Sequence, residues 1–284
     1  MRTRRVFLLT VVAMIAFAGN SLLCRLALRQ SGIDAATFTS IRIISGVIAL
    51  WLILSARTGA RHIEGSWLSA IALFAYAAAF SFAYLSLSAA TGALLLFSAV
   101  QATMIIWGLQ KGERLHLRQW LGLALAVGGL ITLLFPGLSS PSLAGSVLML
   151  TAGVAWGVYS LRGKGGRDPL AATAGNFLRA APMTLVLSVL FLPAARFDWR
   201  GAVYAIVSGA FASGVGYAVW YNALPGLRAA SAAAVQLSVP VLAALGGIIL
   251  LAEPLTWRFF IASVCILGGI ALVVIEKQLR ISPS

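Results

Sequence analysis

The chain has 284 residues, of which 61% are hydrophobic and only 10% are charged, and its mean hydropathy is +0.97. Soluble domains carry about a quarter charged residues, so this composition excludes an ordinary soluble enzyme. The formal net charge of +14 could suggest a nucleic-acid partner. Most of the basic residues lie in short connections, however, and these form no folded basic face interleaved with aromatic side chains, so no nucleic-acid binding is predicted.

Long charge-free runs determine the fold class. Residues 65–110 and 119–161 contain no Asp, Glu, Lys or Arg, and 201–227 and 229–252 are each long enough to cross a bilayer, which takes about 20 apolar residues. Divided at their turn residues, the runs predict an all-α polytopic membrane protein with ten transmembrane helices and no room for a soluble domain. The predicted spans are 6–24, 36–56, 67–86, 90–109, 119–135, 143–161, 171–192, 201–222, 229–251 and 258–275.

The positions of the 21 Lys and Arg residues predict the orientation. With a cytoplasmic N-terminus, 14 of them lie in cytoplasmic segments and five on the opposite side, a bias that follows the positive-inside rule. Both termini are therefore expected in the cytoplasm. The start of the chain, basic and then apolar up to Ala16-Phe17-Ala18, imitates a cleavable signal peptide. Because the apolar character continues through Leu28, we expect this segment to remain as the first span.

The second half of the chain repeats the first. A turn-rich stretch at 135–141 separates five spans from five, which predicts two repeats, 1–138 and 139–284. Because five is odd, the second repeat enters the membrane from the opposite side; such inverted repeats recur in secondary transporters, whose substrate sites lie between the halves. Offset 137 pairs Arg25 with Arg162, Arg42 with Arg179 and Tyr84 with Tyr221, and offset 140 pairs Ser98 with Ser238, Glu113 with Glu253, Arg118 with Arg258 and Gly128-Gly129 with Gly268-Gly269.

Polar side chains inside the spans are few. In hydrocarbon, an amide or guanidinium without a partner is costly, so such groups face the protein interior or a water-filled cavity. Each of them could line a transport path, or could simply form a hydrogen bond to a neighbouring helix. The candidates are Asn20, Arg42, Ser98, Gln101, Asn176, Arg179, Asn222, Gln236 and Ser238.

Aromatic side chains gather on matching helix faces of both halves. Such faces can stack on a flat apolar substrate while hydroxyls and amides orient its polar end. Helix packing and interfacial aromatic belts are the alternative explanations. The residues are Tyr76, Phe80 and Tyr84 in the third span, Trp156 and Tyr159 in the sixth, and Tyr217 and Tyr221 in the eighth.

Two arginines occupy equivalent positions inside the spans. Arg42 and Arg179 lie seven or eight residues into the second and seventh spans, roughly 10 Å deep at 1.5 Å per residue. They could grip a substrate carboxylate during gating, or they could bond helix-end carbonyl groups. We favour the structural role.

All seven acidic residues lie in loops or at span ends. Proton- and cation-coupled carriers commonly place a carboxylate at a span centre. Its absence argues against selective uptake of lipophilic cations and leaves the driving force of transport undetermined. Glu113 and Glu253 are expected to cap turns or to pair with Arg118 and Arg258. The two Cys and two His residues show neither a disulfide framework nor metal-ligand spacing, and no cofactor or metal is expected.

The ten short spans, the inverted repeat, the Glu-x-Leu-x-x-Arg motif followed by Gly-Gly in both halves, and the positions of Arg42 and Arg179 together resemble the drug/metabolite transporter superfamily, specifically its EamA-domain exporters. Within that family the chain most resembles the YddG-type exporters of aromatic amino acids. The resemblance implies a bacterial-type inner membrane location and a cavity lined mainly by spans 1, 3, 4, 6, 8 and 9. Carried onto this chain, it implies substrate contacts from Asn20, Tyr84, Gln101, Trp156, Tyr159, Tyr217, Tyr221 and Gln236, with Arg42, Arg179, Ser98 and Ser238 as gating or structural residues.

The leading hypothesis is a secondary transporter that exports neutral amino acids, aromatic ones included, by alternating exposure of one cavity. The main alternative is an exporter of drugs or other small metabolites with the same fold; a membrane enzyme or a scaffold is the remaining one. The expected partners are a small-molecule substrate and the lipid bilayer, and the expected assembly is a monomer or a weak homodimer.

Overall fold

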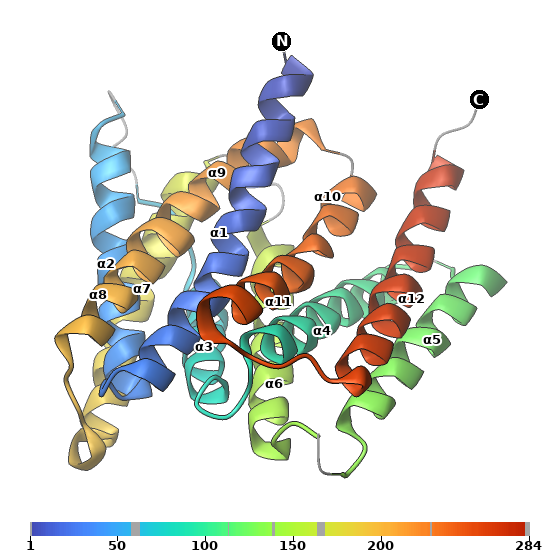
Figure 1. Ribbon diagram of the computed structural model, residues 1–284. Coiled ribbons are helices and arrows are strands. Elements are labelled where there is room, and N and C mark those ends of the chain that lie inside the picture. Colours follow the sequence, from blue (N-terminus) through green and yellow to red (C-terminus); the bar gives the residue numbers. More distant parts are fainter. Residues whose placement is uncertain are drawn as a thin grey trace.

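The computed structural model describes residues 2–57, 63–112, 114–137, 140–163, 168–227 and 229–281, which form helices and connections and no strand (Figure 1). The first half comprises α1 (Arg2–Gln30), α2 (Ala35–Ser55), α3 (Trp67–Ala83), α4 (Ala89–Gln110) and α5 (Leu117–Leu134). The second half comprises α6 (Leu143–Gly163), α7 (Pro169–Leu190), η1 (Leu192–Ala194), α8 (Trp199–Val207), η2 (Ser208–Val215), α9 (Gly216–Ala223), η3 (Leu224–Gly226), α10 (Ala229–Gln236), α11 (Ser238–Leu251) and α12 (Trp257–Ile281).

The ten predicted spans are confirmed, and two of them are broken helices. The eighth span consists of α8, the π-helix η2 and α9. Within η2, Gly209 lies so close to α2 that a Cβ atom there would be 2.0 Å from the carbonyl oxygen of Arg42. The ninth span is divided into α10 and α11, because Pro240 lacks an N–H and its ring clashes with the carbonyl group of Gln236, where α10 ends.

The first span is longer than predicted. It was expected to end at residue 24, because Arg25 is charged, but α1 continues to Gln30. The side chains of Arg25 and Arg29 are held by the carboxylate of Glu253, so the last turns of α1 remain helical beyond the apolar run.

The two halves interlock through matching contacts. Figure 1 shows that α1 starts at the end of the bundle that carries both termini, whereas α6 starts at the opposite end, so the halves are inverted. Helices α2 and α7, α4 and α11, and α5 and α12 pack as equivalent pairs. The contact of α1 with α9 matches that of α6 with α3, and the contact of α1 with α11 matches that of α6 with α4. The space between the halves is therefore bounded by both of them.

Two sequence predictions fall on parts of the chain for which no structure is described. The predicted boundary between residues 138 and 139 lies outside the described residues, and so does Glu113.

The outer face of the bundle carries large apolar side chains such as Trp51, Leu68 and Ile249, as expected of a surface in contact with lipid.

Candidate transport cavity

An open cavity lies at the end of the bundle that carries both termini. It encloses about 720 Å³ of empty space, including the solvent at its mouth. Much of its wall is formed by the last turns of α6 and α9, by the short helix α10 and by the middle of α1. Its lining residues are Phe17, Met104, Trp156, Ser160, Leu161, Tyr217, Trp220, Tyr221, Leu224, Ala232 and Gln236.

A second, smaller chamber of about 310 Å³ lies deeper in the bundle. Phe17, Trp156 and Tyr217 line both chambers, so these three rings stand between them. Together the chambers are lined by spans 1, 3, 4, 6, 8 and 9, the set that the family resemblance implies. The deep chamber is lined by Phe17, Asn20, Ser21, Tyr76, Phe80, Leu96, Phe97, Trp156, Ala212 and Tyr217.

Trp156 is the centre of an aromatic cluster between the two chambers. Its ring is stacked on Tyr159, with 5.4 Å between centroids and 28° between planes. Tyr217 and Tyr76 approach the same ring at 4.8 and 4.9 Å, and Phe17 meets it edge-on at 6.3 Å. Because the side chains hold one another in place, they present fixed aromatic faces on which a flat substrate can stack.

The polar groups of the deep chamber form one connected network. The amide nitrogen of Asn20 donates a hydrogen bond to the Tyr76 hydroxyl at 3.0 Å, and the Asn20 carbonyl oxygen accepts one from Ser208 at 2.6 Å. Arg42 donates from Nη2 to the same Tyr76 hydroxyl at 3.0 Å and from Nε to Ser213 at 3.4 Å. Both serines belong to η2, so the π-helix supplies hydroxyl groups to this network, in keeping with the frequent use of π-helical turns at functional sites.

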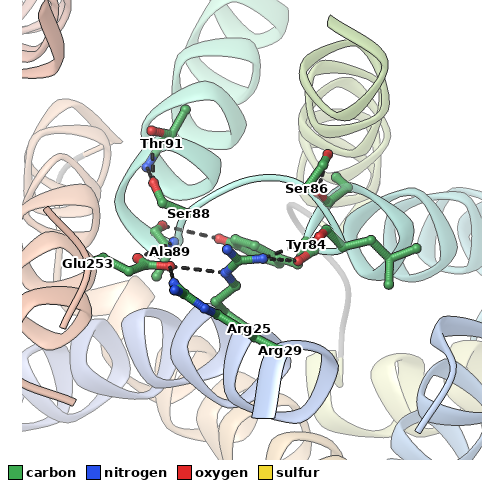
Figure 2. A network of polar contacts seen from close by, with 10 residues as sticks. Arg25, Arg29, Tyr84, Ser86, Ser88, Ala89, Thr91 and Glu253 are labelled. Atoms are coloured by element: carbon green, nitrogen blue, oxygen red, sulfur yellow. Dashed lines mark hydrogen bonds and ion pairs between the residues drawn. The ribbon is translucent and has the colours of Figure 1, made fainter. Parts of the chain in front are cut away.

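Beyond the deep chamber, the end of the bundle opposite the open cavity is closed by a buried ion pair (Figure 2). Glu253 is 4% exposed and accepts a hydrogen bond from Arg25 Nε at 3.0 Å. Its other oxygen, Oε2, accepts one from the Ala89 N–H, at the start of α4, at 2.8 Å. Nη1 of Arg29 lies 3.7 Å from Oε1, the oxygen that also binds Arg25. Arg25 also donates to the backbone carbonyl of Tyr84 at 2.8 Å. These contacts tie together α1, the end of α3, the start of α4 and the loop after α11.

Local backbone geometry explains the burial of Glu253. Ala252 adopts a left-handed conformation with φ of 50° and ends α11, which is common at a helix C-terminus. The chain then turns back so that the Glu253 N–H donates to the carbonyl group of Gly247 at 3.0 Å. This turn places the carboxylate against α4 and α1 rather than in solvent.

Of the two roles expected for Glu253, capping a turn or pairing with Arg258, the pairing is not found. Arg258 donates instead to the carbonyl group of Phe135, and Glu253 binds Arg25, which lies in the other half of the chain. Arg162, the repeat counterpart of Arg25, donates to the hydroxyl groups of Ser69 and Ser66 at 3.1 and 3.4 Å. The two ends of the bundle are thus unlike: equivalent arginines have different partners, and one end is open.

The structure brings together most of the residues expected to bind substrate. Trp156 and Tyr217 line both chambers, Asn20 lines the deep one, and Tyr221 and Gln236 line the open one. Tyr159 is buried behind Trp156.

Three of the expected substrate contacts, Tyr84, Gln101 and Tyr159, line neither chamber. All three are buried. The Tyr84 hydroxyl donates to the carbonyl group of Ala89 at 3.4 Å, next to the Arg25–Glu253 ion pair that closes the end of the bundle. We therefore assign Tyr84 to the closed end rather than to the cavity.

The residues expected to gate or to support the structure differ in their surroundings. The hydroxyl groups of Ser98 and Ser238 donate to carbonyl groups of their own spans, Leu94 and Val235. Arg179 donates from Nη1 to the carbonyl oxygens of Glu64 and Gly175, both at 2.9 Å, which is the expected structural role. Arg42, by contrast, reaches the polar network of the deep chamber.

The expected substrate contacts omitted several aromatic residues of the cavity wall, among them Phe17, Tyr76, Phe80 and Trp220. The signal for the first two was present, since Tyr76 shares a helix face with Phe80, and Phe17 lies about one turn from Asn20 on α1. Among the described residues, no group of three His, Cys, Asp or Glu side chains could hold a metal ion.

Ten membrane-spanning helices in two inverted halves around a central cavity define the fold of a membrane carrier. The chain belongs to the EamA-like transporter family, a branch of the drug/metabolite transporter superfamily. The sequence profile of that family matches the chain twice, over residues 4–135 and 143–275.

Similar proteins cover nearly the whole chain. A protein of Pseudomonas aeruginosa is 56% identical over 98% of this chain and 97% of its own length. An uncharacterized transporter of Archaeoglobus fulgidus is 24% identical over 95% of this chain and 98% of its own, and the uncharacterized transporter YoaV of Bacillus subtilis is 22% identical over 82% and 85%. A crystal structure of a protein with 18% identity superposes with a TM-score of 0.71 over 98% of this chain and 99% of that chain, a likeness of fold.

Proposed function

We propose that this protein exports neutral amino acids, aromatic ones included, across the inner membrane by alternating exposure of the central cavity. The proposal rests above all on the aromatic cluster around Trp156, which lies between the two chambers at the interface of the halves. Aromatic faces hold an apolar side chain, whereas the amides of Asn20 and Gln236 and the Tyr76 hydroxyl offer partners to the polar end of an amino acid.

The difference between the two ends supports the transport direction that we propose. With both termini in the cytoplasm, as the basic residues predict, the open chamber faces the cytoplasm and the Arg25–Glu253 ion pair closes the outer end. Substrate then enters from the cytoplasm, and rearrangement of the interlocked halves exposes it on the other side. No covalent step is needed.

A flux panel in proteoliposomes tests this function. The purified protein is reconstituted, and movement of radiolabelled phenylalanine, tryptophan, leucine and lysine is measured beside that of the cationic dye ethidium. We expect saturable, protein-dependent flux of phenylalanine and tryptophan and none of lysine or ethidium. Movement of ethidium without amino-acid flux would instead support a multidrug exporter of the same fold.

A further inference from the structure

The deep chamber has a cation beside it that no acid of the described chain neutralises. Arg42 is 1% exposed, and its guanidinium carbon lies 5.2 Å from the centroid of the Tyr76 ring and 4.9 Å from that of Phe80. Both rings line the deep chamber. The ion pairs among the described residues join Glu253 to Arg25 and Arg29, and Asp168 to Arg57, so none of them reaches Arg42.

A hydrogen-bond donor of this network remains unused. Nη1 of Arg42 is buried and donates to no atom of the described residues. The Tyr76 oxygen accepts hydrogen bonds from Asn20 and Arg42. The cluster therefore offers positive charge and an unused donor at one place.

A buried guanidinium with an unused N–H carries a large desolvation cost unless a counter-ion accompanies it. Cation–π contacts with Tyr76 and Phe80 offset part of this cost, but they leave Nη1 without an acceptor. A carboxylate is the group that matches both needs, because it carries the opposite charge and accepts several hydrogen bonds at once.

We propose that Asn20 and Tyr76, which line the deep chamber, and Arg42, which lies beside it, bind the carboxylate of the transported molecule; these three residues are called here the anion cluster. This inference builds on the proposed function and narrows its substrate class. The aromatic rings of the chambers hold the apolar body, and the anion cluster holds the acid. The lining residues of both chambers include no Asp or Glu, so a substrate ammonium group meets no opposite charge there. Aromatic monocarboxylates without an amino group therefore belong to the substrate class.

The repeat counterpart of Arg42 provides a contrast. Arg179 is partly exposed, and its Nη1 already donates to the carbonyl oxygens of Glu64 and Gly175. Equivalent positions in the two halves thus have different surroundings, and only Arg42 joins a network that lines a chamber. Arg179 therefore offers a control for the loss of one arginine from a membrane span.

Three ligands that differ only in their charged groups test the anion cluster. Binding of L-phenylalanine, 3-phenylpropionate and L-phenylalaninamide to the purified full chain is measured by calorimetric titration in detergent. We expect the two acids to bind at least tenfold more tightly than the amide, which lacks the carboxylate. Arg42→Gln should remove this preference by weakening both acids at least tenfold, whereas Arg179→Gln should preserve it.

A second variant keeps the test independent of the folding of Arg42→Gln. Asn20→Asp places a carboxylate beside Arg42 and Tyr76, where it occupies the position proposed for the substrate acid. We expect it to weaken both acids at least tenfold and to leave binding of the amide within about threefold of wild type. Melting temperatures of the variants report on their folding.

The outcomes separate this inference from the proposed function. Wild-type protein that binds and transports phenylalanine but binds the amide equally well overturns the anion cluster and leaves amino-acid export intact. Binding of 3-phenylpropionate without phenylalanine supports the anion cluster and contradicts amino-acid export. If none of the three ligands binds to the wild type, both proposals are wrong.

Discussion

Nε of Arg25 donates a hydrogen bond of 3.0 Å to Oε1 of Glu253, across 228 residues of sequence. The pair joins the end of α1, in the first half, to the loop after α11, in the second. Because the same carboxylate accepts from the Ala89 N–H, it also holds the start of α4 (Figure 2). Opening of this end requires these contacts to separate. A substitution in the ion pair can therefore weaken the closed end while leaving the residues that line the cavity unchanged.

Glu253→Gln should make the closed end open more often. The amide keeps an oxygen for the Ala89 N–H but loses the charge that holds Arg25, and hydrogen bonds to charged groups contribute about 1.5–3 kcal/mol. We expect the rate of maleimide modification of Cys24, which is fully buried one residue before Arg25, to rise roughly tenfold. Labelling is measured in the Cys265→Ser background.

Cys24→Ser in the same background should abolish the labelling and so identifies its site. Unchanged modification of Cys24 in Glu253→Gln, in protein that melts as the wild type does, would show that the ion pair does not hold this end closed.

Trp156→Ala should lower phenylalanine flux at least tenfold. The substitution removes the ring that contacts Tyr159, Tyr217 and Tyr76, and aromatic contacts contribute about 0.5–1.5 kcal/mol each. Trp51→Ala is the matched control, because Trp51 is 58% exposed on the outer face of α2. Initial rates in proteoliposomes measure the difference. Equal flux in the two variants would remove Trp156 from the transport path.

Substitution by alanine at the two adjacent glycines of α12, Gly268 and Gly269, should have different effects on the stability of the protein. A Cβ atom at Gly269 would lie 2.3 Å from the carbonyl oxygen of Gly122 on α5, whereas one at Gly268 would meet no atom within 4 Å. Gly269→Ala should therefore destabilise the α5–α12 contact by about 1–3 kcal/mol, and Gly268→Ala should be neutral or slightly stabilising. Thermal unfolding in detergent gives both values. A Gly268→Ala variant that is the less stable of the two would contradict this packing.

The carboxylate of Asp34 should stabilise the protein only above about pH 4. Burial raises the pKa of Asp34, but hydrogen bonds from Thr37, from the Arg196 N–H and from the Ala36 N–H outweigh it and hold the pKa below its ordinary value of 3.8. A lowered pKa in the folded state means that the stabilisation is complete above the unfolded value and is lost as the pH falls through the folded one.

The comparison of wild type with Asp34→Ala across pH measures this contribution. Asp34 caps α2, and loss of such a cap costs about 1 kcal/mol. The difference in melting temperature should be present at pH 7 and should shrink below about pH 4. A difference that is the same at pH 3 and pH 7 would mean that the charge of Asp34 makes no contribution.

Span positions and the inverted halves could be predicted because they depend on hydrophobicity and length, which a sequence displays directly. Helix spacing also placed Tyr76, Phe80 and Tyr84 on one face. Spacing does not say how far along that face the cavity extends: the first two residues line the deep chamber, whereas Tyr84, one turn or about 6 Å further on, belongs to the closed end.

The partner of Glu253 could not be predicted from the sequence, because the nearest basic residue along the chain, Arg258, is not the nearest in space. Contacts between the halves bring Arg25 there instead. The π-helix η2 likewise gives no periodic signal, so the approach of Ser208 and Ser213 to Asn20 and Arg42 emerged only from the structure.

The claim that the two halves enclose a cavity that carries aromatic amino acids is tested most directly by counterflow. Proteoliposomes are loaded with unlabelled phenylalanine and diluted into a trace of radiolabelled phenylalanine. We predict a transient accumulation of label above its equilibrium level, which requires a carrier whose cavity is exposed to each side in turn. Label that only equilibrates, at the rate seen in protein-free liposomes, would contradict the account.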